Sequence, residues 1–159
     1  MKTNAMRLLD KAKIKYETLE YQIAKEDFDG KRVSDLLGMD YRSCYKTLGV
    51  KSGHDIYLAV VSIDDELDLK KIAKAAGVKN VEMIHVKDLL KLVGYERGSV
   101  SPVGAKKNSG IFFDDEADNH EEIEISGGMM GIGLKVRTTD IISFLNAKVA
   151  NIRKDRNEK

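Results

Sequence analysis

The chain has 159 residues, with 27 Lys and Arg against 26 Asp and Glu, a formal net charge of +1 and one cysteine. This length suits one domain with a sizeable core, and the single cysteine excludes a disulfide framework and favours a reducing compartment. The near-zero charge predicts no bulk attraction to nucleic acid, so any such contact must come from a local basic patch. The N-terminus shows no apolar signal-peptide region, and no apolar run approaches the roughly 20 residues of a membrane helix.

The first half of the chain alternates helical and strand-like patterns. Apolar residues spaced at i, i+3, i+4 and i+7 predict amphipathic helices, and strict alternation predicts half-buried strands. Asn4 is a candidate N-cap for the first helix, Gly38 a stop for the second, and 51–55 a hairpin loop. The predicted elements are, in order, a helix over 4–13, a strand over 17–23, a helix over 31–37 and two hairpin strands over 44–50 and 56–63.

The second half predicts more strands, with helices between them. Thr138 or Thr139 caps the last helix, and Ser126-Gly127-Gly128 forms a turn between the last two strands. The predicted elements are helices over 68–76, 86–93 and 138–149 and strands over 81–83, 111–113, 122–125 and 132–136. Because strands come in groups with helices between them, we expect an α+β (mixed α/β) fold, rather than the regular alternation of a Rossmann fold.

One domain is expected over 1–152, followed by a charged C-terminal tail over 153–159. No repeat, Pro/Ser-rich linker or low-complexity segment divides the chain. The residues from Asn151 onward are nearly all polar, so this end is predicted to fray.

Signatures of common cofactor and metal sites are missing. No glycine-rich phosphate loop or dinucleotide fingerprint occurs, and His54, His85 and His120 lie in separate segments without metal-ligand spacing. We therefore predict no cofactor and no metal. No Gly-x-Ser-x-Gly elbow supports a Ser-His-Asp triad, although spacing alone leaves a triad open. Cys44 is interpreted as a small hydrophobic residue on a buried strand rather than as a thiol nucleophile.

Two features stand out against this background. Lys46 shares the apolar face of its predicted strand with Cys44 and Leu48. It either protects a sheet edge or extends to solvent, or it places a cation at the mouth of a pocket, aimed at a phosphate or a polarised carbonyl. The segment 98–104, Gly-Ser-Val-Ser-Pro-Val-Gly, is either an ordinary connection or a stiff loop that presents backbone N–H groups to a ligand.

At these residues the sequence resembles the YbaK/EbsC family of aminoacyl-tRNA deacylases, relatives of the editing domain of bacterial prolyl-tRNA synthetases. The similarity runs from Ala5 to about Ile152 and rests on motifs whose order and spacing are specific. These motifs are Tyr45-Lys46-Thr47-Leu48, LDLKKIAKAAG at 67–77, Gly94-Tyr95, Gly98-x-x-x-Pro102 continued by VGAKK at 103–107, and Ser126-Gly127-Gly128. The resemblance implies a highly curved, barrel-like mixed sheet. It also implies a cytoplasmic trans-editing enzyme, lyase-like or hydrolytic, that removes cysteine from mischarged tRNA(Pro).

The resemblance also implies roles for individual residues. The family's lysine falls on Lys46 and its loop glycine on Gly98, which are the expected catalytic positions. The expected substrate-binding residues are Tyr21, Phe28, Ser99, Ser101, Pro102, Ser126 and Gly127. In the implied reaction the protein positions the aminoacylated 3′ end of a tRNA, and the thiol of the bound cysteine attacks its own carbonyl. A prolyl-tRNA synthetase is an expected partner, a membrane is not, and the oligomeric state is left open.

The chain departs from the family pattern at Ser99, at Ala105 and over Met129–Gly133, where relatives often show glycine, glutamine and Lys-Arg-Gly-Leu-Asp. The last departure removes two basic residues and a pocket carboxylate. Two alternatives therefore stay open, namely a deacylase for another small residue such as alanine, and a non-catalytic module that binds a tRNA acceptor end or a synthetase. Candidates for a tRNA track are Lys70, Lys71, Lys74, Lys106 and Lys107, a pattern that a solvated surface explains equally well.

Overall fold

A computed structural model describes residues 2–156 of the chain. Its α-helices are α1 (Asn4–Lys11), α2 (Gly30–Leu37), α3 (Leu69–Ala76), α4 (Val86–Leu92) and α5 (Thr138–Leu145). Short 3₁₀ turns lie at η1 (Lys25–Asp27), η2 (Tyr41–Ser43) and η3 (Asp115–Asn119). The strands are β1 (Tyr16–Glu20), β2 (Tyr45–Ser52), β3 (Asp55–Ser62), β4 (Glu82–Met83), β5 (Gly110–Asp114), β6 (Glu122–Met129), β7 (Ile132–Arg137) and β8 (Lys148–Ala150).

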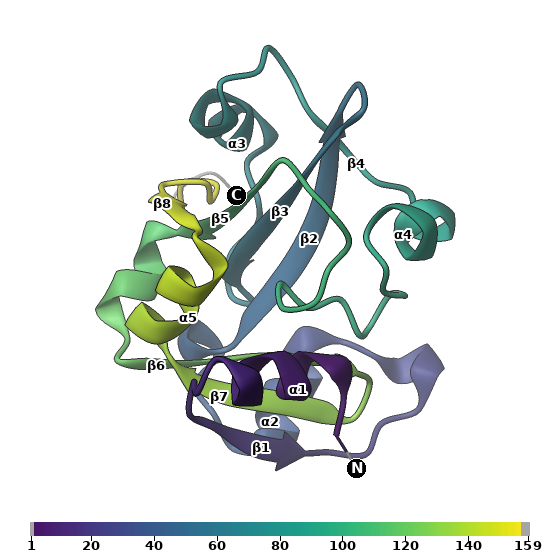
Figure 1. Cartoon of the computed structure of the whole chain (residues 1–159), viewed down its shortest axis with the longest axis vertical. Helices are drawn as coiled ribbons and strands as arrows, with labels where there is room; N and C mark the ends of the chain where they lie inside the picture. Colours follow the sequence, from purple (N-terminus) through teal and green to yellow (C-terminus); the bar gives the residue numbers. More distant parts are fainter. Residues whose placement is uncertain (1, 157–159) are drawn as a thin grey trace.

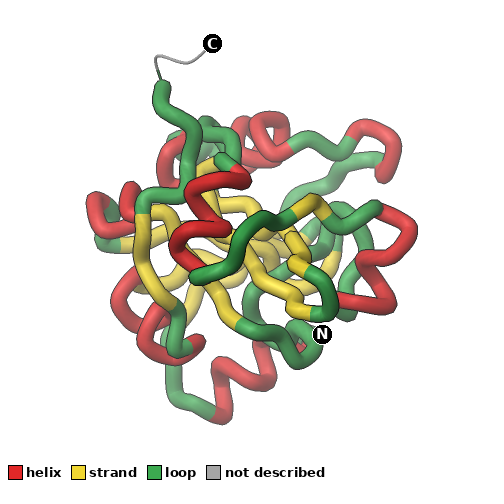
Figure 2. The backbone as a smooth tube through the Cα atoms, turned by 90° about the horizontal axis from the view of Figure 1, so that it is seen from above, coloured by secondary structure: helices red, strands yellow, loops and turns green. Residues whose placement is uncertain are grey.

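The strands form two sheets that cross one another. A three-stranded antiparallel sheet has the order β1-β7-β6, and a five-stranded mixed sheet has the order β4-β2-β3-β5-β8, in which β5 pairs in parallel with β3 and β8. The β2–β3 hairpin rises steeply from the smaller sheet, with α3 on one side and α4 on the other (Figure 1). Seen from above, the strands gather in the middle and the helices surround them (Figure 2).

The predicted mixed α+β fold is confirmed, whereas the term barrel-like describes it only loosely. Within the described residues, the two sheets meet through an isolated parallel bridge between Cys44 and Glu124, and the sheet does not close on itself. No helix in residues 2–156 combines the length and the apolar character needed to cross a membrane.

The apolar stripe of helix α1 packs against the core. Ala5, Met6 and Leu9 are buried in a core cluster that also contains side chains from β6 and β7. The N-cap is Thr3 rather than the predicted Asn4, because the Thr3 hydroxyl accepts a hydrogen bond from the Met6 backbone N–H at 3.2 Å.

Two predicted elements near the C-terminal half are wrong. Ser126-Gly127-Gly128 is not the turn between the last strands, because β6 continues through it with a register shift, and the turn falls at Met130-Gly131. The last helix does not reach residue 149, because Asn146 takes a left-handed conformation with φ of 51° and ends it. The chain then pairs with β5 as β8, a strand that its short pattern did not predict.

The predicted fraying from Asn151 is also wrong for the residues that the structure describes. Ile152 is fully buried, and its backbone N–H donates to Asp114 at 3.0 Å. Arg153 pairs with the second oxygen of Asp114 at 2.9 Å, and Arg156 makes two 3.1 Å bonds to the buried Asp65. The first four residues of the predicted tail, 153–156, are thus tied to the domain, whereas 157–159 lie outside the described residues.

We expect Asp114→Ala to lower the free energy of unfolding by about 3 kcal/mol, because it leaves the Ile152 N–H and the Arg153 guanidinium without their buried acceptor. Urea denaturation measures this loss. Asp115→Ala is the matched control, since it removes the exposed carboxylate from the same guanidinium and should cost less than about 1 kcal/mol. Equal losses in the two variants would contradict an anchoring role for Asp114.

Candidate active site

A cavity of about 290 Å³ lies where the two sheets diverge. The edge of β2 that faces away from β3 is paired at both ends. At its start lies the Cys44–Glu124 bridge, and near its end Val50 and Lys51 pair with β4. Residues 45–49 between these two points line the cavity, together with parts of β6, α4, the segment 97–100 and residues from 21 to 33. The cavity therefore lies beside the stretch of the β2 edge between these two pairings.

Lys46 contributes a partly buried ammonium group to this cavity. Within residues 2–156 this ammonium group has no carboxylate oxygen within 4.0 Å and donates no hydrogen bond. Burial lowers the pKa of Lys46, and the more distant charges of Glu66 and Asp65 oppose that shift. A cation without a partner beside a cavity is suited to bind an anionic or strongly polar ligand.

Gly98 brings the loop close to the opposite wall. Its φ of +93° lies in the left-handed region that favours glycine, and an added Cβ would stand 2.5 Å from the terminal methyl of Met130 and 3.6 Å from the Phe28 ring. The loop is tied to β6, because the Ser126 hydroxyl donates to the Ser99 carbonyl at 3.1 Å. The backbone at Gly98 is therefore held in the wall of the cavity, by packing near Phe28 and Met130 and by the hydrogen bond from Ser126 to the next residue.

The structure brings some of the predicted site residues together and leaves others outside. Lys46 and Gly98 line the same cavity, as do the three predicted binding residues Tyr21, Phe28 and Ser126. Those that do not line it are Ser99, Ser101, Pro102 and Gly127.

Two of the residues outside the cavity have clear structural roles. The Ser101 side chain is fully buried, and its hydroxyl accepts the Val103 N–H at 3.2 Å, so it shapes the loop instead of facing a ligand. Gly127 packs where an added Cβ would stand 2.7 Å from Ile132, so its contribution is close strand packing.

Sequence reasoning missed Glu124, a cavity residue on β6. Only 7% of its surface is exposed, and burial raises the pKa of its carboxyl to about 7, although the neighbouring Cys44 thiol opposes the shift. The available signal was side-chain alternation, which places Glu124 on the same strand face as Ser126. That face looked like the solvent side in the sequence, because Glu122 also belongs to it.

Thr47 is a second missed residue. It is 7% exposed and lines the cavity, and its hydroxyl has no hydrogen-bond partner within the described part of the chain. A buried hydroxyl without a partner costs free energy, so a ligand that bonds to it recovers that cost. Thr47 lies within the Tyr-Lys-Thr-Leu motif, but nothing in the sequence distinguished its hydroxyl from a β-branched strand residue.

Cys44 lies close to the cavity without lining it. Its thiol is 3.4 Å from the Ser34 hydroxyl, and burial raises its pKa to about 12. The thiol therefore stays protonated and is a poor nucleophile, as its interpretation as a buried hydrophobic residue requires.

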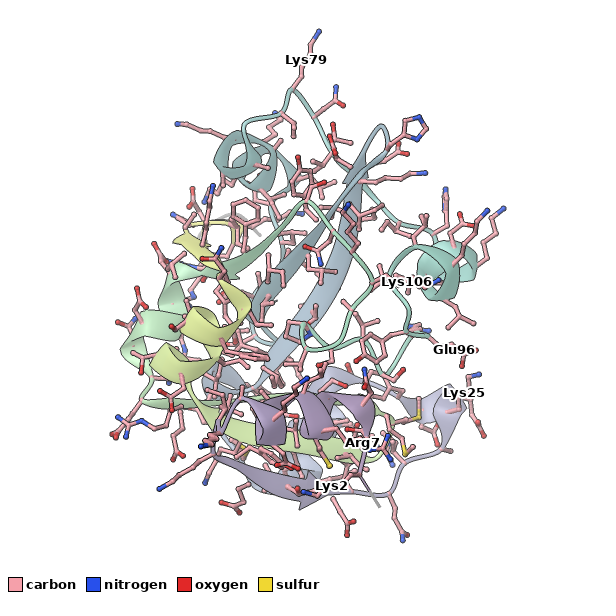
Figure 3. All side chains as sticks on the ribbon, viewed as in Figure 1. Lys2, Arg7, Lys25, Lys79, Glu96 and Lys106 are labelled. Atoms are coloured by element: carbon pink, nitrogen blue, oxygen red, sulfur yellow. The ribbon has the colours of Figure 1, made fainter. Side chains whose placement is uncertain are left out.

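The predicted tRNA track divides into two separate surfaces. Helix α3, which carries Lys70, Lys71 and Lys74, lies across the β2–β3 hairpin from Lys106 (Figures 1 and 3). None of the five predicted track residues lines the cavity. The basic residues beside it are instead Arg97, which lines it, and Lys25 and Lys87, which with Arg97 line an adjoining groove of about 410 Å³.

Two sequence comparisons identify relatives of the same kind. The model of the family described as "Aminoacyl-tRNA editing domain" matches residues 29–144. The chain is 38% identical to "Putative Cys-tRNA(Pro)/Cys-tRNA(Cys) deacylase EbsC" of Enterococcus faecalis, over 95% of this chain and 93% of the relative.

Solved structures show the same fold at low sequence identity. "Hypothetical protein APE2540" has a TM-score of 0.84 at 21% identity, covering 93% of this chain and 97% of its own. "A putative trans-editing enzyme for prolyl tRNA synthetase" has a TM-score of 0.80 at 19% identity, covering 98% of this chain and 100% of its own.

We expect the buried carboxyl of Glu124 to make folding stability depend on pH. Because its pKa rises from 4.5 to about 7, the folded protein keeps a proton that the unfolded chain has released between those values. The free energy of unfolding of the wild type should therefore fall, relative to Glu124→Gln, by up to about 3 kcal/mol as the pH rises from about 4.5 to about 8. Denaturant titrations at several pH values measure this difference.

The control for that titration is Glu122→Gln, which removes an exposed carboxylate from the same strand. Parallel stability curves for the wild type and Glu124→Gln over this pH range would show that the Glu124 carboxyl ionises as freely in the folded protein as in the unfolded chain.

Proposed function

Since this chain belongs to the aminoacyl-tRNA editing domain family, we propose that it is a trans-editing deacylase that removes cysteine from mischarged tRNA(Pro). The resemblance to the YbaK/EbsC deacylases is confirmed by the family match and by the Enterococcus faecalis relative. The observation that carries the proposal is that Lys46 and Gly98, which are far apart in the sequence, line one cavity. The proposed place of action is the cytoplasm, where charged tRNA is used.

The size of the cavity supports a small aminoacyl ester as the group that enters it. About 290 Å³ lies at the small end of ligand pockets, which suits an amino acid and its ribose better than a longer stretch of nucleic acid. In this arrangement Lys46 lies near the terminal phosphate or ribose, and the backbone N–H groups around Gly98 lie near the ester carbonyl. Arg97, Lys25 and Lys87 then border the path of the preceding nucleotides.

The nucleophile in this proposal is the thiol of the bound cysteine. The residues that line the cavity include no histidine and no cysteine, and the nearby Cys44 thiol is buried and protonated. When the substrate thiol attacks its own carbonyl, a sulfur–carbon bond forms and the ester bond to the ribose oxygen breaks. The thiol proton ends on the freed ribose hydroxyl, and the amino acid leaves as a cyclic thiolactone. The protein contributes positioning and charge stabilisation.

We expect the wild type to deacylate Cys-tRNA(Pro) faster than Ala-tRNA(Pro) or Pro-tRNA(Pro), because alanine and proline carry no thiol. Lys46→Ala should lower kcat/KM for Cys-tRNA(Pro) by about 10- to 100-fold, the loss expected for one charged contact. Lys51→Ala, which removes a lysine of the same strand that pairs with Glu82, is the matched control. The measurement is release of radiolabelled amino acid from each tRNA.

Each outcome of that assay bears on one part of the proposal. A wild type that clears none of the three substrates would favour the non-catalytic binding module. Equal clearance of alanine and cysteine would exclude attack by the substrate thiol. Full activity in Lys46→Ala would remove only the role given to Lys46.

We also propose that a prolyl-tRNA synthetase presents the tRNA, because a net charge of +1 gives the chain little long-range attraction of its own. The isolated protein should then bind tRNA(Pro) with a Kd above about 1 µM at physiological salt, with a shallow dependence on salt concentration. Filter binding over a salt series measures both. Nanomolar binding by the isolated protein would contradict the need for a partner.

A further inference from the structure

Glu124 is the one acidic side chain among the residues that line the cavity. Its carboxylate is nearly buried, and within residues 2–156 no Lys, Arg or His nitrogen lies within 4.0 Å of it. Two titratable groups interact electrostatically with this carboxylate, namely the Cys44 thiol and the Tyr21 hydroxyl. Burying a carboxylate without a cation is costly, so its retention beside a cavity points to a cation that arrives with the ligand.

The two cavity charges, Lys46 and Glu124, do not neutralise each other. Within residues 2–156 no ion pair of 4.0 Å or less joins the Lys46 ammonium to the Glu124 carboxylate. Lys46 lines the cavity from β2, whereas Glu124 lines it from β6. The cavity has a cation on one wall and a carboxylate on another.

The strand beside Glu124 is shaped to accommodate its carboxylate. A Cβ added to Gly133 on β7 would stand 2.4 Å from Glu124 Oε2, which is closer than any side chain allows. Gly133 is not among the glycines of positive φ, so its backbone conformation does not itself demand glycine. The carboxylate of Glu124 therefore occupies the space that a side chain at position 133 would need.

We propose that Glu124 binds the α-ammonium group of the esterified amino acid, an inference that rests on the proposed function. An aminoacylated tRNA end carries a positive α-ammonium and a negative phosphate on opposite sides of the ester. This charge pattern matches a cavity with Glu124 on one wall and Lys46 on another. An ionised carboxylate is purely an acceptor and forms its strongest hydrogen bonds with charged N–H donors. Glu124 thereby selects an esterified amino acid with a free α-amine over an acyl group that lacks the amine.

The test compares Cys-tRNA(Pro) with tRNA(Pro) that carries a 3-mercaptopropionyl group. This second substrate keeps the thiol and the ester, lacks the α-amine and is no larger than cysteine. After each rate is divided by the spontaneous hydrolysis rate of the same ester, the wild type should prefer the cysteinyl substrate by about 10- to 100-fold in kcat/KM. In Glu124→Gln this preference should fall to within about threefold, mainly through loss on the cysteinyl substrate.

A rescue experiment uses the space at Gly133. Glu124→Ala should lose the preference, and the double variant Glu124→Ala with Gly133→Asp should regain most of it, because the new carboxylate projects into the volume that Glu124 Oε2 occupied. Glu124→Ala with Gly133→Ala is the matched control, which fills the same position without a charge and should regain nothing. Thermal unfolding of every variant checks that the fold is retained.

A binding measurement without turnover separates this inference from the proposed function. Calorimetry with 3′-cysteinylamino-3′-deoxyadenosine and its 3-mercaptopropionyl counterpart should show a preference of at least about tenfold for the amine, lost in Glu124→Gln. Binding with this preference but no deacylation would overturn the proposed function and retain the ammonium site. An unchanged preference in Glu124→Gln, or an equal loss on both ligands, would overturn the ammonium site whether or not the protein is an editing enzyme.

Discussion

The structure depends on an incomplete join between two sheets. Backbone N–H and C=O groups along a strand edge need partners. Within residues 2–156, β2 pairs with strands other than β3 only at its two ends, through the Cys44–Glu124 bridge and through β4. Between those ends the strand edge faces a cavity. The location of the cavity is therefore a consequence of strand pairing, and the side chains that happen to stand along the open stretch define its chemistry.

The cavity combines features that are individually costly. Lys46 is partly desolvated without an ion pair, Glu124 is nearly buried without a cation, and Thr47 keeps a buried hydroxyl without a partner in the described part of the chain. A protein selected only for stability would replace or pair such groups. These three groups line the same cavity. This is the physical pattern expected of a site in which a ligand supplies the missing partners.

Local packing keeps these groups in place. Gly98 holds the loop between Phe28 and Met130, and the Ser126 hydroxyl ties the same loop to β6. Met130 also lines the adjoining groove, together with Phe28 and Arg97. At Gly133, the carboxylate of Glu124 on the neighbouring strand occupies the space that a side chain would need.

The sequence by itself determined the elements that depend on local patterns. The apolar stripes of α1 and α3, the glycine stops after α2 and α3, and the β2–β3 hairpin follow from spacing and turn chemistry, which act within a few residues. Lys46 and Gly98 were identifiable because they lie in recognisable motifs. Only the tertiary structure decided that β8 pairs with β5, that Asp114 anchors the C-terminal residues, and that Glu124 faces a cavity instead of solvent. Each of these depends on contacts between segments far apart in the chain, and side-chain alternation along a strand shows that two faces differ but not which face a distant strand will cover.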